Sequence, residues 1–307
     1  MSEKKNNLNI AGGLLLVVFL WGGNNVGTKW LVGTWPPIFT GATRFLVAGG
    51  ILLAVLRFTK LLSEFKPIER ALWPQLWLRG GFGLAAYIVP FCWALHLTAA
   101  SHVALYIGAS PIWALLAEER PRWNRASFRR YFSALLALAG VVVLFWPALR
   151  TGKASLPGEF CGLIASIAWA NYNWQGRHLG LKIPGVEVAA HSMWMSGVWL
   201  LPLGLVEIFC FHYKFTVDAP HLGVQALCIL FGGVVPYALW NSALRHWRAS
   251  QVMLFNNFIP VTTTLWAFLL LREPLTPTFC AAMALIVAGV LISQMDWAKI
   301  FKVPESF

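Results

Sequence analysis

Apolar residues lie in long runs along this chain, separated by short polar segments. A helix that crosses a membrane needs about 20 mainly apolar residues, and ten runs approach or exceed that length. They cover residues 10–31, 36–57, 72–97, 100–118, 130–149, 158–179, 185–211, 221–244, 250–271 and 276–296. The pattern therefore predicts an all-α integral membrane protein with ten transmembrane helices and no second soluble domain.

The composition agrees with a lipid environment. The 307 residues are 58% apolar and 12% charged, whereas soluble domains have roughly 45–50% apolar and about 25% charged residues. A chain of this length could not hide so much apolar surface from water. These proportions exclude an ordinary soluble globule and a disordered chain, and they make the lipid bilayer an expected partner.

The basic residues predict the orientation in that bilayer. The formal net charge is +12, and the sequence has no separate basic arm of the kind that binds nucleic acid. With loops assigned to alternate sides, 17 Lys and Arg fall on the side of the N-terminus and 5 on the other. Because cytoplasmic loops carry the excess of Lys and Arg, we expect both termini in the cytoplasm and no nucleic-acid partner.

Short motifs for metals, disulfides and ATP are absent from the sequence. The five cysteines are widely spaced without a CxxC pair, so we expect free thiols. No phosphate loop of the GxxxxGK[ST] type occurs, which argues against direct use of ATP by this chain. The first apolar run continues into Trp21-Gly22-Gly23-Asn24-Asn25 instead of a cleavage site, so we expect it to be retained. We predict no cofactor, metal or catalytic group.

The two halves of the chain, 10–149 and 158–296, match when the sequence is shifted by 148 residues, or by 149 from the third span onward. The matches include Trp21 with Trp169, Asn25 with Asn173, Gly49 with Gly197, and Pro111 with Pro260. Each half holds five predicted spans. Because five is odd, the second half crosses the membrane in the opposite orientation to the first. We therefore expect two inverted five-helix repeats in a basket-like 5+5 architecture, with a solute site between them.

A polar stripe lies within the first span. Trp21, Asn24, Asn25 and Thr28 recur at i, i+3, i+4 and i+7, which places them on one face of a helix. An unpaired amide in hydrocarbon costs on the order of several kcal/mol. One interpretation is that the stripe lines a wet cavity and binds a polar solute. The other is that it holds the first span to a neighbouring helix.

Other predicted spans also combine aromatic rings with amides or hydroxyls. A ring offers its face to an apolar group, and an amide offers hydrogen-bond donors and acceptors. For each of these residues helix packing is the alternative role. The candidates are Trp169 and Asn173 in the sixth span, Tyr106 and Trp113 in the fourth, Tyr237, Trp240 and Asn241 in the eighth, and Asn256 and Asn257 in the ninth.

Four of the prolines inside the predicted spans are candidate hinges. A proline within a helix removes a backbone hydrogen bond and bends the helix. Pro111 and Pro260 occupy matched positions of the two halves, whereas Pro90 and Pro236 are out of register by three residues. We interpret them as hinges for alternating access; static kinks that shape the packing are the alternative.

Few charges lie within the spans. Arg44 falls in the middle of the second span and Arg79 some way into the third. Charges inside a membrane are expensive and are therefore functional candidates. Either arginine could pair with a solute carboxylate, or contact backbone carbonyls, or extend to the interface. Glu207 is the acid that we place well within a span, so the sequence shows no paired acids for proton coupling.

The sequence resembles the EamA-type drug/metabolite transporter superfamily over nearly its whole length. The resemblance is carried by WGGNNVGTKW in the first span, Pro36 with Arg44 in the second, Pro111 in the fourth and PVTTTLWAFLLLREPLT in the ninth. It implies a ten-helix exporter of small metabolites, amino acids or drugs. The high Trp content and AEERPRWN at 117–124 resemble most the YddG-type exporters of aromatic amino acids.

One departure from the family pattern concerns the acid near the end of the ninth span, which stands here as Glu273. The equivalent position of the first half is Asn124, and Glu118-Glu119 precede it. The loop chemistry of the two halves is therefore not symmetric.

Together these observations predict a monomeric carrier in a bacterial inner membrane, which exports small amphipathic metabolites, with aromatic amino acids as the more specific hypothesis. Three alternatives stay open: a multidrug or nucleotide-sugar carrier of the same fold, an integral-membrane lipid-modifying enzyme, and a channel. Among acids, Glu118-Glu119 is the adjacent pair that an enzyme of this kind could use.

Overall fold

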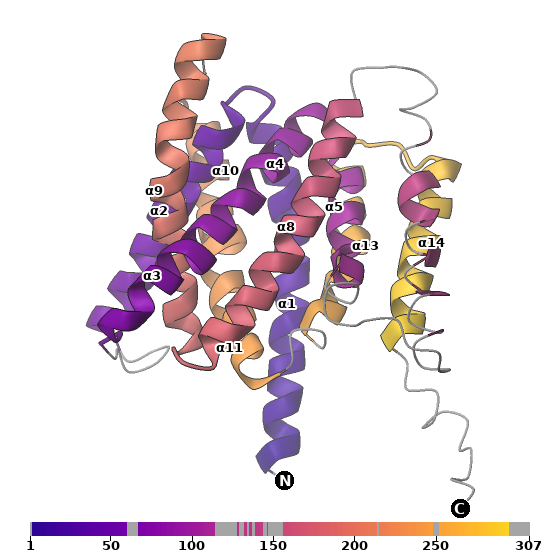
Figure 1. Cartoon of the computed structure of the whole chain (residues 1–307). Coiled ribbons are helices and arrows are strands. Elements are labelled where there is room, and N and C mark those ends of the chain that lie inside the picture. Colours follow the sequence, from indigo (N-terminus) through magenta and orange to yellow (C-terminus); the bar gives the residue numbers. More distant parts are fainter. Residues whose placement is uncertain are drawn as a thin grey trace, which may run out of the picture.

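The structure of the protein is a computed structural model. It describes residues 2–59, 67–113, 156–213, 215–247 and 252–294, together with positions 128, 132–133, 135–136, 139–143 and 146. Within these residues the secondary structure is helical, without strands. The helices pack side by side as one bundle (Figure 1).

The described elements of the first half follow the order of the predicted spans. They are α1 (Ser2–Leu31), α2 (Pro37–Phe58), the continuous run of η1 (Arg70–Leu72), α3 (Trp73–Gln75), η2 (Leu76–Phe82) and α4 (Gly83–Leu97), and then α5 (Ala100–Gly108). α1 begins eight residues before the predicted start at residue 10, because hydropathy marks where a helix becomes apolar and not where it starts.

The second half contains α8 (Leu156–Gly180), α9 (Gly185–Phe211), the continuous run of α10 (Ala219–Leu227), η3 (Cys228–Val234) and α11 (Val235–His246), then η4 (Leu254–Phe258), α13 (Ile259–Leu271) and α14 (Pro277–Gln294). Several helices start with proline at their first or second position, as α2 does with Pro37 and α13 with Pro260. Proline fits there because the N–H groups of the first turn have no acceptor within the helix, so the N–H that proline lacks is not needed.

Five described helices are long and apolar enough to cross a membrane. They are Leu8–Leu31, Pro37–Phe58, Arg70–Leu97, Gly185–Phe211 and Ala219–His246. Two shorter apolar helices cover Phe255–Leu271 and Pro277–Gly289, and α8 is a further long helix of 25 residues. The chain is thus a multi-pass membrane protein. The number ten stays a prediction, because residues 114–118 and half of 130–149 lie outside the described residues.

The packing of α2 against α9 links the two halves. A Cβ placed on Gly204 would lie 2.9 Å from Cα of Phe39, and Gly197 and Gly49 make equally close approaches to Leu46 and Trp194. Residue numbers rise along α2 as they fall along α9, so the two helices run antiparallel. Small residues at these crossings let the backbones approach closely, as in many membrane helix pairs.

The third and eighth predicted spans each contain a π-helical segment, η2 and η3. Each segment carries two adjacent glycines: Gly80-Gly81 packs against Ser192 and Met195 of α9, and Gly232-Gly233 packs against Asn24 and Ala48. Segments of this kind inside α-helices occur often at functional sites.

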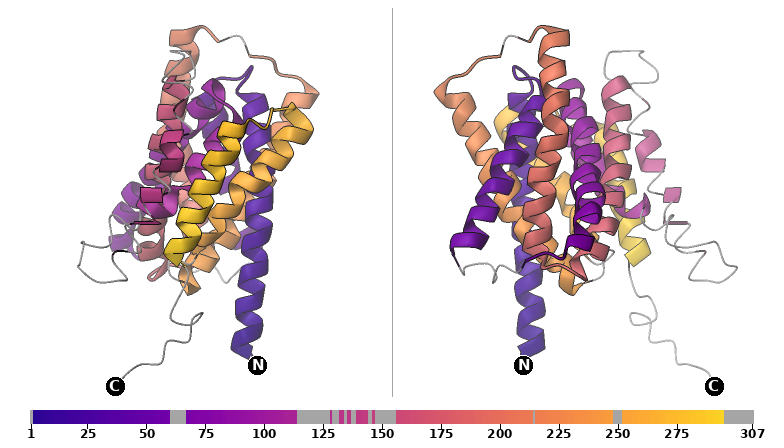
Figure 2. Two further views of the ribbon diagram at one scale, coloured as in Figure 1. Left: turned by 90° about the vertical axis from the view of Figure 1, so that its right-hand side faces the viewer. Right: turned by 60° about the vertical axis from the view of Figure 1, so that its left-hand side comes forward.

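The first turns of α1 and the end of α14 lie at the same end of the bundle (Figures 1 and 2). The connections from α9 to α10 and from α13 to α14 lie at the opposite end. We call the end with these connections the distal end.

Candidate functional site

A small cavity lies between the two halves. Its volume is about 20 Å³, which is room for roughly one water molecule. The residues that line it combine rings, amides and one guanidinium, and both halves contribute to them. They are Trp21, Asn24, Asn25, Arg44, Phe45, Tyr87, Ile88, Phe91, Ile107, Trp169, Gly232, Tyr237 and Ile259.

Aromatic rings form most of the wall around Trp21. The ring centroid of Trp21 lies 5.4 Å from that of Trp169, 5.6 Å from Tyr237 and 4.9 Å from Trp240. These separations are in the range of favourable aromatic pairs. The indole Nε1 of Trp21 donates to the carbonyl of Gly232 at 3.1 Å, within η3. This hydrogen bond connects the Trp21 side chain of α1 to the π-helical segment of the second half.

The amides of the first-span stripe connect α1 to different neighbours. Asn25 Nδ2 donates to Oγ1 of Thr263 in α13 at 3.0 Å. Asn24 Oδ1 accepts from Nη1 of Arg44 at 3.1 Å, and Oγ1 of Thr28 accepts from the same nitrogen at 2.7 Å. The predicted stripe therefore does both things considered for it: it contacts neighbouring helices and it lines a cavity.

Two predicted residues lie directly behind the wall of the cavity. Asn173 is fully buried in α8; its Nδ2 donates to the carbonyl of Trp169 at 2.7 Å, and its Oδ1 accepts from Nε1 of Trp240 at 2.6 Å. Trp240 is likewise buried and packs against Trp21. These two residues position the rings of the wall.

Four further predicted residues lie away from the cavity. The hydroxyl of Tyr106 donates to Glu159 at 2.7 Å, and Nε1 of Trp113 donates to Oγ of Ser166 at 2.9 Å. Nδ2 of Asn256 donates to Oγ of Ser110 at 3.2 Å. Asn257 is 5% exposed, and its amide makes no hydrogen bond within the described structure.

The four predicted hinge prolines have different surroundings. Pro90 lies within α4, and Pro236 and Pro260 occupy the first turns of α11 and α13. Pro236 follows the π-helical segment and Pro260 follows the 3₁₀ segment η4, so both lie where the helix changes its winding. Pro111 is buried just after the end of α5.

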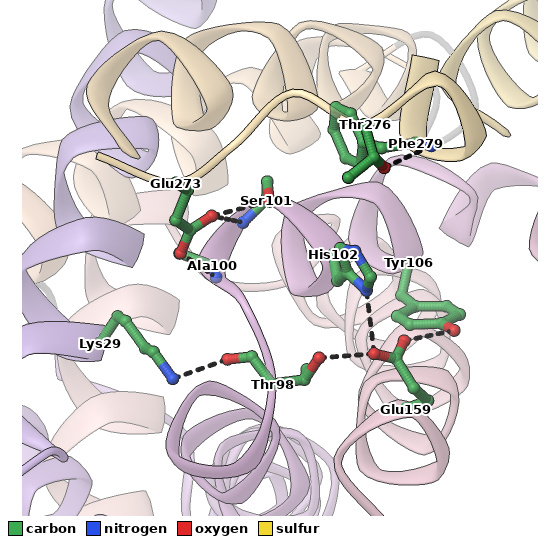
Figure 3. Close-up of polar contacts among 10 residues, drawn as sticks. All are labelled: Lys29, Thr98, Ala100, Ser101, His102, Tyr106, Glu159, Glu273, Thr276 and Phe279. Atoms are coloured by element: carbon green, nitrogen blue, oxygen red, sulfur yellow. Dashed lines mark hydrogen bonds and ion pairs between the residues drawn. The ribbon is translucent and has the colours of Figure 1, made fainter. Parts of the chain in front are cut away.

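Glutamates from the second half cap helices of the first half at the distal end. Glu207 Oε2 of α9 accepts from the backbone N–H of Ile38 at 2.8 Å and of Phe39 at 3.3 Å. Glu273 accepts from the N–H of Ala100 at 2.8 Å and of Ser101 at 3.2 Å (Figure 3). The first N–H groups of a helix have no partner within it, so these carboxylates stabilise the starts of α2 and α5.

A third carboxylate, Glu159, lies in the same region as Glu273 (Figure 3). It is 1% exposed and accepts hydrogen bonds from Thr98 Oγ1 at 2.5 Å and Tyr106 at 2.7 Å, with Nδ1 of His102 at 2.9 Å. Sequence reasoning missed Glu159 because it stands at the edge of an apolar run. The structure buries it since α8 begins three residues earlier, at Leu156.

The linker between α4 and α5 is therefore held from several sides. Lys29 Nζ donates to the carbonyl of Thr98 at 2.8 Å, while from the second half Glu159 binds Thr98 and Glu273 binds the first turn of α5 (Figure 3). Apart from this network, the start of α10 is capped by Asp218, which lies outside the spans. A hydrogen bond from the backbone N–H of His221 holds the pKa of Asp218 below its usual value.

Tyr87 and Phe91 are lining residues that the sequence did not single out. They are four residues apart in α4, and their rings lie 5.2 Å apart. The spacing puts them on one helix face, and this shared face is the sequence signal that could have identified them. Arg79, by contrast, is exposed on the outside of the bundle.

A second hollow of about 420 Å³ opens between α1, α10 with η3, and α13. It is lined by apolar groups such as Phe19, Trp30, Phe231 and Trp266. Asn24 lines both this hollow and the central cavity, so it separates a polar interior from an apolar outer surface.

The five cysteines are free thiols, and among the described residues no group of three metal-binding side chains is found.

Comparison with known proteins gives the same family for both halves. The profile of the EamA-like transporter family matches residues 9–146 and 156–295. The chain is 24% identical over 302 residues to a protein of Escherichia coli named "Probable amino-acid metabolite efflux pump", covering 94% of this chain and 96% of that protein.

Two further similarities concern one relative and one solved structure. The chain is 25% identical over 224 residues to the "Probable terminal-alkyne amino-acid exporter" of Streptantibioticus cattleyicolor, covering 71% of this chain and 72% of that protein. A crystal structure superposes with a TM-score of 0.65 at 20% identity, covering 93% of this chain and 97% of that chain. At this identity the likeness shows the fold.

Proposed function

The chain belongs to the EamA-like transporter family, and we propose that this membrane transporter exports small amphipathic metabolites, including aromatic amino acids. The observation that carries the proposal is the central cavity, where both halves bring rings, amides and a guanidinium together. Relatives named as amino-acid exporters support amino acids as the substrate class.

Alternating access is the mechanism that this arrangement supports. In the closed cavity, Trp21 of the first half packs against Trp169 and Tyr237 of the second. A solute with an aromatic ring would replace these contacts with its own as the halves separate. The antiparallel packing of α2 and α9 supports an inverted repeat, in which the two halves can exchange roles on opposite sides of the membrane.

Polar contacts at the distal end supply a closing interaction for this mechanism. Glu159 and Glu273 of the second half hold the α4–α5 linker and the first turn of α5 in the first half. With both chain ends in the cytoplasm, as the distribution of Lys and Arg favours, this end faces the outside of a bacterial inner membrane. Opening it would require these hydrogen bonds to break.

Counterflow in proteoliposomes tests the proposed function. Vesicles with purified protein are loaded with unlabelled amino acids, both aromatic and aliphatic, and uptake of the labelled amino acid is followed. Saturable exchange of at least one amino acid is the expected result. Exchange of a cationic drug or a nucleotide sugar without exchange of any amino acid would favour the alternative carriers, and ion conductance without saturation would favour a channel.

A lipid-modifying enzyme is the alternative of a different class. Such an enzyme would use Glu118 and Glu119, which lie outside the described residues. Normal exchange after Glu118→Gln and Glu119→Gln would count against it.

A further inference from the structure

Arg44 is a buried cation whose hydrogen-bond acceptors are neutral. It lies in the middle of α2 and is 2% exposed. Its Nη1 donates to the amide oxygen of Asn24 and the hydroxyl of Thr28, and its guanidinium carbon lies 5.0 Å from the centre of the Phe45 ring. These contacts fix the side chain and leave its positive charge without a negative partner.

The acids of the described structure do not supply that partner. No ion pair joins Arg44 to a carboxylate among the described residues, and its buried Nε has no hydrogen-bond acceptor. The carboxylates of Glu159, Glu207 and Glu273 are hydrogen-bonded at the distal end. A buried charge without a partner destabilises the structure, and an anion from outside the chain would relieve that penalty.

The lining of the cavity decides which other groups the anion can carry. Arg44 and the two amides, Asn24 and Asn25, form its polar part, and the remaining residues are aromatic, aliphatic or glycine. The lining contains no Asp or Glu that could bind an ammonium group. Buried ring faces attract cations, but the full positive charge of Arg44 in the same lining opposes this attraction. An amino group on the solute therefore gains little here.

Building on the function proposed above, we infer that Arg44 binds the carboxylate of the solute and that the amino group is dispensable. A guanidinium binds a carboxylate well because its parallel N–H groups match the two oxygens. The ligand class is then an apolar or aromatic monocarboxylate, of which aromatic amino acids are one kind. 3-Phenylpropanoate belongs to this class and phenethylamine does not.

Direct binding to the purified wild-type protein in lipid nanodiscs tests the inference. Labelled phenylalanine, 3-phenylpropanoate and phenethylamine are each titrated at equilibrium. We expect 3-phenylpropanoate to bind within about tenfold of phenylalanine, and phenethylamine at least roughly tenfold more weakly, as the loss of a charge-assisted hydrogen bond predicts. Equal or tighter binding of phenethylamine would overturn the inference.

The outcomes for the inference and for the proposed function are separate. Binding of 3-phenylpropanoate but not phenethylamine supports the role of Arg44 whether or not phenylalanine is exchanged. Failure of all three compounds to bind overturns that role, whereas the proposed function is decided by the counterflow assay with its wider range of amino acids.

Variants of the two basic residues locate the effect. Arg44→Gln should weaken 3-phenylpropanoate at least roughly tenfold and remove its advantage over phenethylamine, and Arg44→Lys should keep part of that advantage. Arg79→Gln is the matched control, because Arg79 is exposed on the outside of the bundle and does not line the cavity. An unchanged preference in a folded Arg44→Gln protein would overturn the inference. If that variant does not fold, Arg44→Lys and the wild-type titrations decide.

Discussion

Gly49 of α2 and Gly197 of α9 make reciprocal contacts across the interface between the two halves. A Cβ on Gly49 would lie 2.9 Å from Cα of Trp194, and a Cβ on Gly197 would lie 2.8 Å from the backbone N of Leu46. The shift of 148 residues that relates the halves converts Leu46 into Trp194 and Gly49 into Gly197. Each contact is therefore the image of the other, as a two-fold axis through this interface requires.

Alanine at either glycine should force α2 and α9 apart. We expect Gly49→Ala and Gly197→Ala each to lower the free energy of unfolding by about 1–3 kcal/mol, which is typical of overpacking. Gly50→Ala is the matched control, since a Cβ there meets nothing within 4 Å, and better helix propensity should add up to about 1 kcal/mol. Thermal unfolding in detergent measures all three. Equal midpoints for Gly49→Ala and Gly50→Ala would contradict the close packing.

Helix positions could be predicted well from the sequence where apolar runs end at a turn signal. The run at 185–211 coincides with α9, and the run at 36–57 differs from α2 by one residue at each end. Hydropathy gives no sign of the change to π-helical winding in η2 and η3, because this change depends on which neighbours press against the glycines.

The candidate site could be predicted only in part, for a physical reason. Polar residues inside a membrane must face a partner, and periodicity identifies that face without identifying the partner. Trp21 and Tyr106 look alike by this criterion, yet Trp21 lines the cavity and Tyr106 binds Glu159. Tyr87 escaped notice because no amide or hydroxyl side chain stands three or four residues from it on the same helix face.

Removing wall residues of the cavity should impair transport. We expect Asn25→Ala and Trp169→Ala to lower the rate of amino-acid exchange at least roughly tenfold, through loss of a hydrogen-bonding group and of ring contact with the solute. Trp21→Ala should do the same. Trp174→Ala is a control on the same helix as Trp169, since its ring is 43% exposed and packs on His178. Full exchange activity in the cavity variants would remove these residues from the site.

Tyr106→Phe should affect stability and leave solute affinity unchanged. The variant removes a buried hydroxyl that donates to the carboxylate of Glu159 at 2.7 Å, which is worth about 1.5–3 kcal/mol. We therefore expect a lower thermal midpoint with an unaltered KM for exchange. Trp169→Phe, in the wall itself, should instead change KM. A raised KM in Tyr106→Phe would assign this tyrosine to the solute site.

Glu273→Gln should loosen the start of α5. The carboxylate accepts from two backbone N–H groups and from Oγ of Ser101 at 2.7 Å, whereas a neutral amide has one oxygen and no charge to offer. We expect faster hydrogen exchange at the amides of Ala100 and Ser101, by about tenfold for each 1.4 kcal/mol lost. Glu69→Gln, at an exposed glutamate, serves as the control. Exchange rates equal to those of the wild type would show that the cap is dispensable.

Asn256 and Asn257, adjacent in η4, allow a test of whether an unpaired buried amide serves transport. Asn257 is buried without a hydrogen bond in the described structure, while Asn256 donates to Ser110 at 3.2 Å. An unsatisfied amide costs about 1–3 kcal/mol, and an apolar residue of similar shape removes that cost. Asn257→Leu should therefore raise the thermal midpoint, whereas Asn256→Leu should lower it, because it leaves the buried hydroxyl of Ser110 without this partner.

Exchange measurements on the same variants show what the unpaired amide does. If η4 takes part in alternating access, Asn257 gains its partner in another state of the cycle, and Asn257→Leu should slow exchange several-fold while stabilising the closed form. A more stable protein with unchanged exchange would show that this amide plays no part in transport. A less stable Asn257→Leu protein would show instead that this amide contributes to the stability of the closed form.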